Sequence, residues 1–413
     1  MKRELEITVS RGGFKKLREL NRKRNYLIKD AKLNLKIFIA KIKWDSHRKS
    51  SFDISKVKTV LLIRNEGTIG DIVVTTPLIK SLNNKGFDVD ILVTHKSAIA
   101  LKYNKHVRNI YEADDCNHQT FLKEYNHTVP VDTINALRNN AYDLVIDLCL
   151  FDIPVHRMKL YYDINAKCVA GFNKWNCINR YSLSIPFKNG KDHITKAITA
   201  MAEALDVDNY SRSPYDLDLP EKYVNDVKEY FNTLTGKKIV INYLTGSSER
   251  DFSQQQVSGI IRLINEHYPD VSIVIIDRYK QLDIPLPENA VLNPFNTLHH
   301  VMALIYSADV VISPDTSIVH IAAAWEKTLV SVYKNVTDNN DLWGPEYNNA
   351  SQIILNVRKL ANAPELPERV MKELNTLYPP TNQLKTNPQQ ARTAWQAELF
   401  DGRFQEHRKG LKA

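Results

Sequence analysis

The sequence lacks several features that would assign it to a common class of protein. It has four cysteines in 413 residues and no Cys-x-x-Cys pair, which argues against a disulfide framework and a zinc site. GxGxxG and GxxxxGK[ST] loops are both missing, so nicotinamide chemistry and a P-loop ATPase are poorly supported. No apolar run reaches the roughly 18 residues of a spanning helix, and the start lacks a signal-peptide core. We therefore expect a cytoplasmic protein, at most peripheral to a membrane.

The positive charge is concentrated at one end of the chain. The net charge is +9, and residues 1–50 hold 16 Lys and Arg against 5 Asp and Glu, whereas the remainder holds 40 against 42. Apolar residues in this arm recur at spacings of three and four, which is typical of an amphipathic helix. They are Ile28, Ala31, Leu35, Phe38 and Ile42, with Leu33, Ile37, Ala40 and Trp44 widening the face and Lys29, Lys32, Lys36 and Lys43 flanking it.

Two interpretations of this arm are open. A basic amphipathic helix can lie in the headgroup region of a membrane that contains anionic lipid. It can equally be an appended helix that packs on the first domain with its lysines in water. Nucleic-acid binding is the weaker alternative, because no docking motif or interleaving of aromatic and basic residues accompanies the charge.

Residues 60–82, VLLIRNEGTIGDIVVTTPLIKSL, form the most informative segment. The short apolar run at 60–63 predicts a strand that is buried on both faces. Gly67 and Gly70 allow a tight turn and a close approach of the backbone to a ligand. Asp71 then stands in the first turn of a helix, at the edge where open α/β sheets bind ligands. It either serves that site or only caps the helix.

Residues 310–333, VVISPDTSIVHIAAAWEKTLVSVY, repeat the plan of strand, polar turn and helix. Backbone N–H groups at such a helix start, with hydroxyl groups beside them, can bind a phosphate. These two segments resemble, in the right order, the signature stretches of glycosyltransferase family 9, the ADP-heptose:lipopolysaccharide heptosyltransferases of Gram-negative bacteria. The resemblance covers roughly residues 57–360, and further matching stretches are YDLVIDL at 142–148, VAGF at 169–172, Asp192-His193, IVINYLTGSSERD at 239–251 and LWGP at 342–345.

The resemblance implies an α/β fold of the GT-B architecture, in which two doubly wound Rossmann-like domains face one another across a cleft, here with a basic helical N-terminal arm. We expect the arm at 1–55, an acceptor domain at 57–207, a linker and entry segment at 208–236, a nucleotide-sugar donor domain at 237–360 and a tail at 361–413 with a closing helix at 387–407. In the second domain we expect strands at 239–243, 271–276, 309–313 and 328–333, and helices at 253–266, 297–307 and 316–325.

The resemblance also implies roles for individual residues. Asp71 matches the catalytic base of the family. The donor diphosphate is expected at the helix start formed by Thr316 and Ser317, and Arg250 could neutralise the leaving phosphate. The other expected donor contacts are Thr245, Ser247, Ser248, Asp315 and His320, and the expected acceptor contacts are Arg64 and Asn65.

Some of these assignments have alternatives. Asp315 is expected mainly as the helix cap that orders its loop. His320 can make a structural hydrogen bond as easily as a phosphate contact. Arg250 can be a solvated loop charge.

The predicted reaction is an inverting, metal-independent transfer of heptose from ADP-heptose to a lipopolysaccharide or lipooligosaccharide core. No cofactor or metal is expected; the acids of Asp88-Val89-Asp90 stand at a strand entrance and are weak evidence for a cation. Family members usually carry glycine at the positions of Ser317 and of Lys334-Asn335, and a glycine-rich turn with a glutamate at Asp277-Arg278, which leaves the donor open.

The expected partners are the nucleotide sugar, the lipid A-core acceptor and the inner face of the cytoplasmic membrane, without nucleic acid. The alternatives are another nucleotide-sugar donor and a catalytically degenerate scaffold for polysaccharide assembly.

Overall fold

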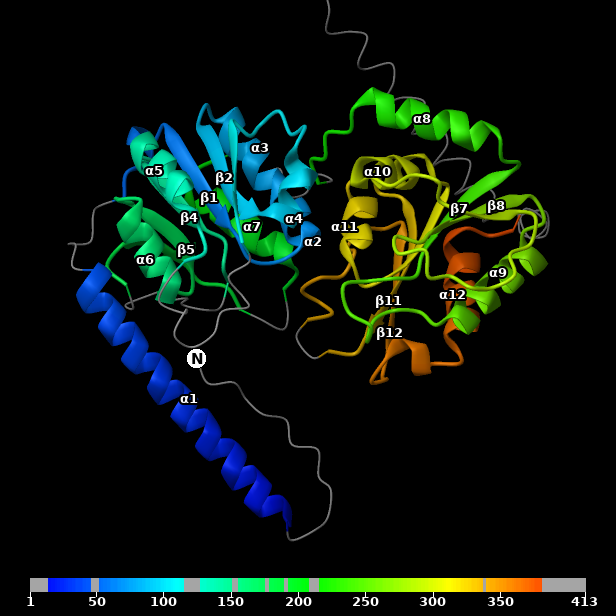
Figure 1. Cartoon of the computed structure of the whole chain (residues 1–413), viewed down its shortest axis with the longest axis horizontal. Coiled ribbons are helices and arrows are strands. Elements are labelled where there is room, and N and C mark those ends of the chain that lie inside the picture. Colours follow the sequence, from blue (N-terminus) through cyan, green and yellow to red (C-terminus); the bar gives the residue numbers. More distant parts are fainter. Residues whose placement is uncertain are drawn as a thin grey trace, which may run out of the picture. The chain divides into compact units, whose positions relative to one another are not determined.

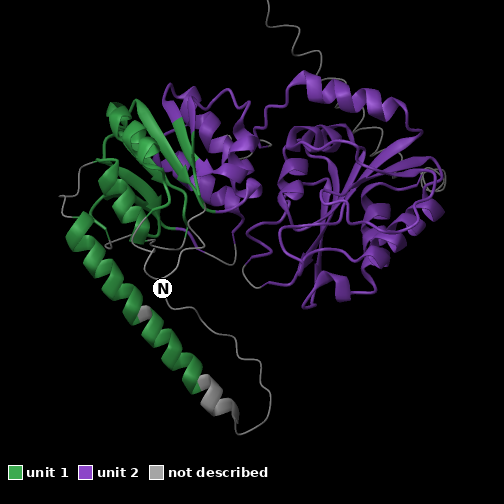
Figure 2. Cartoon of the chain, viewed as in Figure 1, with its two compact units in different colours: residues 1–66, 90–92, 111–186 green, residues 67–89, 93–110, 187–413 purple. Residues whose placement is uncertain are grey.

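The structure is a computed structural model that describes residues 14–45, 52–114, 127–150, 155–174, 178–188, 192–207, 215–336 and 339–380. The chain forms two compact units, which Figure 2 shows in different colours. Unit 1 comprises residues 1–66, 90–92 and 111–186, and unit 2 comprises residues 67–89, 93–110 and 187–413. The candidate base and all candidate donor residues therefore belong to unit 2.

The first sheet has six strands in the order β3-β2-β1-β4-β5-β6. They are β1 (Thr59–Arg64), β2 (Asp88–Thr94), β3 (Asn109–Ala113), β4 (Leu144–Asp147), β5 (Val169–Phe172) and β6 (Tyr181–Ile185). Strands β1 and β4 pair in parallel, with Val60 opposite Leu144. Residues 60–64 of β1 are all buried, as expected for a parallel strand covered on both faces. This strand ends where the glycine turn begins.

The second sheet also has six parallel strands, in the order β12-β11-β10-β7-β8-β9. They are β7 (Lys237–Asn242), β8 (Val271–Ile276), β9 (Ala290–Leu292), β10 (Val310–Pro314), β11 (Thr328–Lys334) and β12 (Ala350–Leu355). Because β7 and β10 are parallel neighbours, the loops that follow them leave from the same edge of the sheet. The two sheets confirm the predicted α/β class.

The helices of unit 1 are α1 (Phe14–Trp44), α5 (Val131–Asn140) and α6 (Val155–Asp163). Those of unit 2 are α2 (Ile69–Val73), α3 (Thr76–Asn84), α4 (His95–Ala98), α7 (Ile194–Ala204), α8 (Glu221–Asn232), α9 (Gln254–His267), α10 (Leu298–Ser307), α11 (Ser317–Ala323) and α12 (Leu366–Leu377). Figure 1 shows all of these elements in the colours of the sequence. Ser253 caps α9 in a reciprocal capping box with Gln256, a local start signal that the sequence carries.

The strands and helices predicted for the donor half are confirmed, with ends shifted by two residues at most. The sequence prediction missed β9, β12 and α12, and it assigned to a linker the segment in which α8 forms. Helix α8 buries Tyr223, Val227 and Phe231, which recur every four residues, a helical pattern that the sequence prediction overlooked. The expected closing helix at 387–407 lies outside the described residues, and the predicted domain boundaries stay a prediction.

Candidate functional site

Asp71 lies in the first turn of α2, and its side chain closes that turn. Its Oδ2 accepts the backbone N–H of Thr68 at 2.7 Å and lies 3.1 Å from the Thr68 hydroxyl group. The two residues form a capping box. Gly67 has φ +95°, and a Cβ atom there would lie 2.6 Å from Asp71 Oδ2. The glycine is therefore needed both for the backbone conformation and for the space that this carboxylate occupies.

The second glycine of the motif brings α2 against α11. A Cβ atom at Gly70 would lie 2.8 Å from Cδ2 of His320 and 3.5 Å from Cα of Ser317. The sequence suggested that this glycine approaches a ligand, whereas in the structure it approaches a second helix. As a result, the helix that carries Asp71 packs directly on the helix that begins after Thr316.

His320 is 5 % exposed and is enclosed largely by apolar and aromatic groups. Its ring lies 5.8 Å from the Trp343 ring and 6.1 Å from that of Tyr215, centroid to centroid. Its Nδ1 has no hydrogen-bond partner among the described residues. Burial lowers the pKa of His320 to about 4, helped by the nearby His193 and opposed by the Asp71 carboxylate. The imidazole is therefore neutral at physiological pH.

The loop after β7 is ordered by its own side chains. Asp251 Oδ1 accepts the backbone N–H of Thr245 at 2.6 Å and lies 2.9 Å from the Thr245 hydroxyl group. That hydroxyl group also lies 2.7 Å from the carbonyl oxygen of Ser247 and accepts the Ser247 N–H at 2.9 Å. Thr245 therefore shapes the loop, while Ser248 is exposed and directly available to a ligand.

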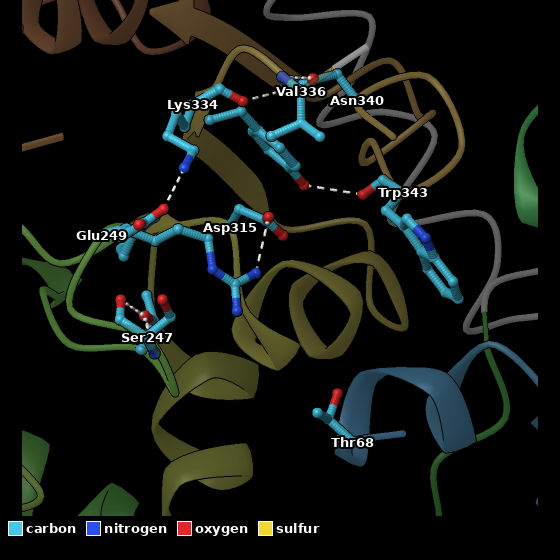
Figure 3. Close-up of polar contacts among 12 residues, drawn as sticks. Thr68, Ser247, Glu249, Asp315, Lys334, Val336, Asn340 and Trp343 are labelled. Atoms are coloured by element: carbon cyan, nitrogen blue, oxygen red, sulfur yellow. Dashed lines mark hydrogen bonds and ion pairs between the residues drawn. The ribbon is translucent and has the colours of Figure 1, made fainter. Parts of the chain in front are cut away.

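Arg250 and Asp315 join the loops that follow β7 and β10. Arg250 Nη1 donates to Asp315 Oδ2 at 2.9 Å, and their side chains are 36 % and 15 % exposed; Figure 3 shows this pair. The cap expected of Asp315 is wrong, because the N-cap position of α11 belongs to Thr316, which makes no side-chain cap bond. Asp315 orders the region through a long-range ion pair that sequence spacing cannot reveal.

A second ion pair lies in the same region. Lys334, at the end of β11, pairs with Glu249, the neighbour of Arg250. The carbonyl oxygen of Lys334 accepts from Asn340 Nδ2 at 3.0 Å, as drawn in Figure 3. Sequence analysis had noted Lys334 only as a departure from the usual glycine, and had not included it in the site.

Arg64 and Asn65 lie in unit 1, and both are buried. Arg64 Nη1 donates to the carbonyl oxygen of Leu148 at 2.7 Å, which ties the end of β1 to the end of β4. The next residue, Glu66, pairs with the fully buried Arg157 of α6. Sequence analysis missed Arg157, because an arginine within an amphipathic helix normally indicates a solvated position.

His193 belongs to one of the stretches that resemble the family, and it is the N-cap residue of α7. Its Nε2 lies 2.9 Å from the carbonyl oxygen of Gly344, and the N–H of Ile194 donates to the carbonyl oxygen of Leu342 at 3.0 Å. Both contacts fix the turn at residues 342–345, which places Trp343 beside His320.

Asp90, one of the two acids considered as a cation ligand, is buried in unit 1 and accepts from the Tyr142 hydroxyl group at 2.5 Å. Across the described ranges no cluster of three or more metal-ligating side chains occurs. No helix in the described part of the chain is both long and apolar enough to span a bilayer.

The chain is similar to known proteins along most of its length. Residues 130–376 match the family model described as glycosyltransferase family 9 (heptosyltransferase). An Escherichia coli K12 protein provisionally named lipopolysaccharide heptosyltransferase 4 is 26% identical over 347 residues, which cover 82% of this chain and 92% of that protein.

Solved structures share the fold at 15% identity. A family 9 glycosyltransferase from Veillonella parvula has a TM-score of 0.61, covering 78% of this chain and 97% of its own. For E. coli ADP-heptose lps heptosyltransferase II the TM-score is 0.57, and the match covers 77% of this chain and 98% of that one. For E. coli heptosyltransferase WaaC with ADP the TM-score is 0.54, and the match covers 78% of this chain and 99% of that one. These findings confirm the expected GT-B fold.

The buried His320 predicts a specific pH dependence of stability. The unfolded chain takes up a proton near the ordinary histidine pKa of 6.5, whereas folded His320 does so only at about 4. Unfolding should therefore become easier as the pH falls between these values, by up to about 3 kcal/mol from this group. His320→Gln should remove that part of the slope in urea unfolding curves, whereas His267→Gln, at an exposed position, should keep it. An unchanged slope in His320→Gln would contradict the assignment.

Proposed function

Because the chain belongs to glycosyltransferase family 9, we propose that it transfers a heptose from ADP-heptose to the core oligosaccharide of lipopolysaccharide or lipooligosaccharide, with inversion at the anomeric carbon and without a metal. The observation that carries the proposal is the packing of Gly70 against His320. This contact brings the helix of a candidate base against the helix whose start is a candidate phosphate site.

Asp71 is proposed as the base that accepts the proton of the attacking acceptor hydroxyl group. A positioned carboxylate can do this at neutral pH if it remains ionised and oriented. The N–H and hydroxyl group of Thr68 lie 2.7 and 3.1 Å from Oδ2, so they hold the carboxylate in one orientation. A single displacement by this hydroxyl group inverts the anomeric configuration.

The donor diphosphate is proposed to bind at Thr316 and Ser317, where α11 begins, with Ser247, Ser248 and Arg250 on the facing loop. Charge develops on the diphosphate as the bond to the sugar breaks, and cationic groups aimed at it stabilise that charge. Arg250 retains donors besides the Nη1 group that binds Asp315, since a guanidinium group has five N–H donors. Asp315, Thr245 and His320 are proposed to hold the diphosphate-binding groups in position.

The acceptor is proposed to be a lipid A-core oligosaccharide at the inner face of the cytoplasmic membrane, with Arg64 and Asn65 shaping the acceptor edge of unit 1. Another nucleotide sugar remains the alternative donor, since Lys334 stands where family members usually carry glycine. A degenerate scaffold is less favoured, because Asp71 and the Asp315-Thr316-Ser317 turn are both intact.

Asp71→Asn tests the base without disturbing the turn. Asparagine keeps an oxygen that can accept the Thr68 N–H, so the unfolding transition and nucleotide affinity should stay close to those of the wild type. Turnover with a truncated core acceptor should fall by about 100-fold or more. Thr68→Ala is the matched control, because it alters the same turn and leaves the carboxylate. Near wild-type turnover in Asp71→Asn would remove this residue from the mechanism.

Arg250→Ala should weaken the binding of ADP-heptose by about tenfold, because a charge-assisted contact to phosphate is lost. Arg250→Lys should recover only part of this affinity, since lysine cannot present two donors in a plane. Calorimetry measures both, and Arg262→Ala, which removes an exposed arginine of α9, is the control. Equal affinity in all four proteins would place the diphosphate elsewhere.

Turnover should persist in excess EDTA, since the proposed mechanism assigns the diphosphate charge to Arg250 and to N–H donors of the chain. Turnover is measured by mass spectrometry of the acceptor after incubation with a panel of nucleotide sugars, in EDTA or with added Mg²⁺. The same experiment identifies the donor. An absolute requirement for an added divalent cation would contradict the proposal.

A further inference from the structure

Helix α1 carries two apolar stripes, and only one of them packs on the part of the protein that the structure describes. Along its last third, Ala40 is completely buried in the core of unit 1, and Ile37 and Trp44 pack against that core. The end of the helix is also tied down by hydrogen bonds. Asp45 accepts the backbone N–H groups of Asn179 and Arg180 at 2.6 and 3.0 Å, and Arg180 Nε donates to the carbonyl oxygen of Trp44 at 3.0 Å.

The other stripe faces water. Ile28, Leu35, Phe38 and Ile42 are 44, 60, 61 and 66 % exposed. At about 100° of rotation per residue they lie on roughly the opposite side of the helix from Ile37, Ala40 and Trp44. Moreover, each described side chain from Leu20 to Leu35 is exposed. The packing of α1 on unit 1 therefore accounts for one stripe and leaves the second unexplained.

The exposed stripe has basic residues along both sides. By the same helical rotation, Lys32 and Lys43 lie along one flank and Lys41 along the other. The whole helix holds eleven Lys and Arg against two Asp and Glu, a surplus of nine that equals the net charge of the chain. Arg24 falls on the stripe itself, where a long arginine side chain can reach up to a headgroup while its stem stays apolar.

We propose that this stripe of α1 lies in the headgroup region of a bilayer containing anionic lipid. Apolar residues flanked by lysines fit such an interface, where burial and the attraction of each lysine to the lipid charge add together. A helix largely surrounded by water is also only marginally stable, so contact with lipid would stabilise residues 20–35. The inference rests on the proposed function only in giving a lipid-linked acceptor as the reason for attachment.

Other occupants fit the stripe less well. A second copy of α1 would bring two sets of lysines together, and like charges repel at that distance. A nucleic acid would bind the lysines but leave Phe38 and Ile42 in water. Because Asp45 and Arg180 fix the helix to unit 1, lipid bound by the stripe also sets the direction in which unit 1 faces the bilayer.

Leu35 and Leu33 provide a matched pair for the test. Both are exposed leucines of α1, 60 and 46 % accessible, and they lie two residues apart on different faces of the helix. Glutamine is a good helix former and changes no charge. Leu35→Gln in the full chain should lower partition onto phosphatidylcholine vesicles containing phosphatidylglycerol by about tenfold, and adding Phe38→Gln by about a hundredfold. Leu33→Gln should leave partition unchanged.

Sedimentation with these vesicles measures partition, and vesicles of phosphatidylcholine alone should retain little protein. Raised salt should release the wild type, because screening shortens the reach of the lysines. Equal loss in Leu33→Gln and Leu35→Gln, or binding that ignores phosphatidylglycerol, would overturn the inference. Self-association without vesicles that Leu35→Gln abolishes would assign the stripe to a second copy instead.

Transfer to a soluble, delipidated acceptor separates this inference from the proposed function. The Leu35→Gln and Phe38→Gln variants should keep wild-type turnover on that acceptor and wild-type unfolding transitions. Active protein that never binds vesicles would defeat the membrane inference and leave the reaction standing. Vesicle binding without transfer from any nucleotide sugar would contradict the proposed reaction and would still support the membrane inference.

Discussion

The candidate site depends on the close contact between Gly70 of α2 and His320 of α11, where a single added carbon would lie 2.8 Å from the ring. Through this contact the turn that orients Asp71 packs on the helix that follows Thr316. A buried histidine suits this position because its flat ring fills the space beside a glycine, and desolvation keeps it neutral. A cationic side chain in the same place would lose its hydration among the Trp343 and Tyr215 rings, and the Asp71 carboxylate would offset only part of that cost. The two signature segments of the sequence, about 250 residues apart, thus share one packing constraint.

Much of this architecture follows from local sequence signals. The apolar runs at 60–63 and 310–312 lack alternation, which predicts buried parallel strands, and both are observed in the centre of their sheets. The capping box of α9 and the glycine turn before α2 are equally local. The three-residue strand β9 was too short to recognise, whereas α8 was overlooked although its three buried apolar side chains recur every four residues. Their formation depends on packing against other elements, which tertiary contacts decide and propensity does not.

The residues of the candidate site could be predicted from the sequence, but the contacts that they make with one another could not. Asp71, Arg250 and Thr316 were recognised because each falls in a motif. The partner of Arg250 is 65 residues away, and that of Lys334 is 85 residues away, so no spacing rule could link them. Roles changed accordingly, since Asp315 binds a guanidinium group instead of capping α11. Arg157 shows the same limit in unit 1, because only the fold reveals that it is buried beside Glu66.

The charges around the candidate phosphate site are balanced before any ligand arrives. Arg250 pairs with Asp315 and Lys334 with Glu249, so both cations are oriented by carboxylates of the same region. A diphosphate bound at this proposed site would share these cations, and it would gain less Coulomb energy than two unpaired cations give. In return, little side-chain entropy is lost on binding, because the cations are already held. Lys334 and Glu249 are also more selective than a glycine at that position would be, since a donor group that reaches Lys334 must accept a hydrogen bond or displace Glu249. We therefore propose that the departure of this chain at Lys334 affects the choice of donor sugar more directly than the transfer step.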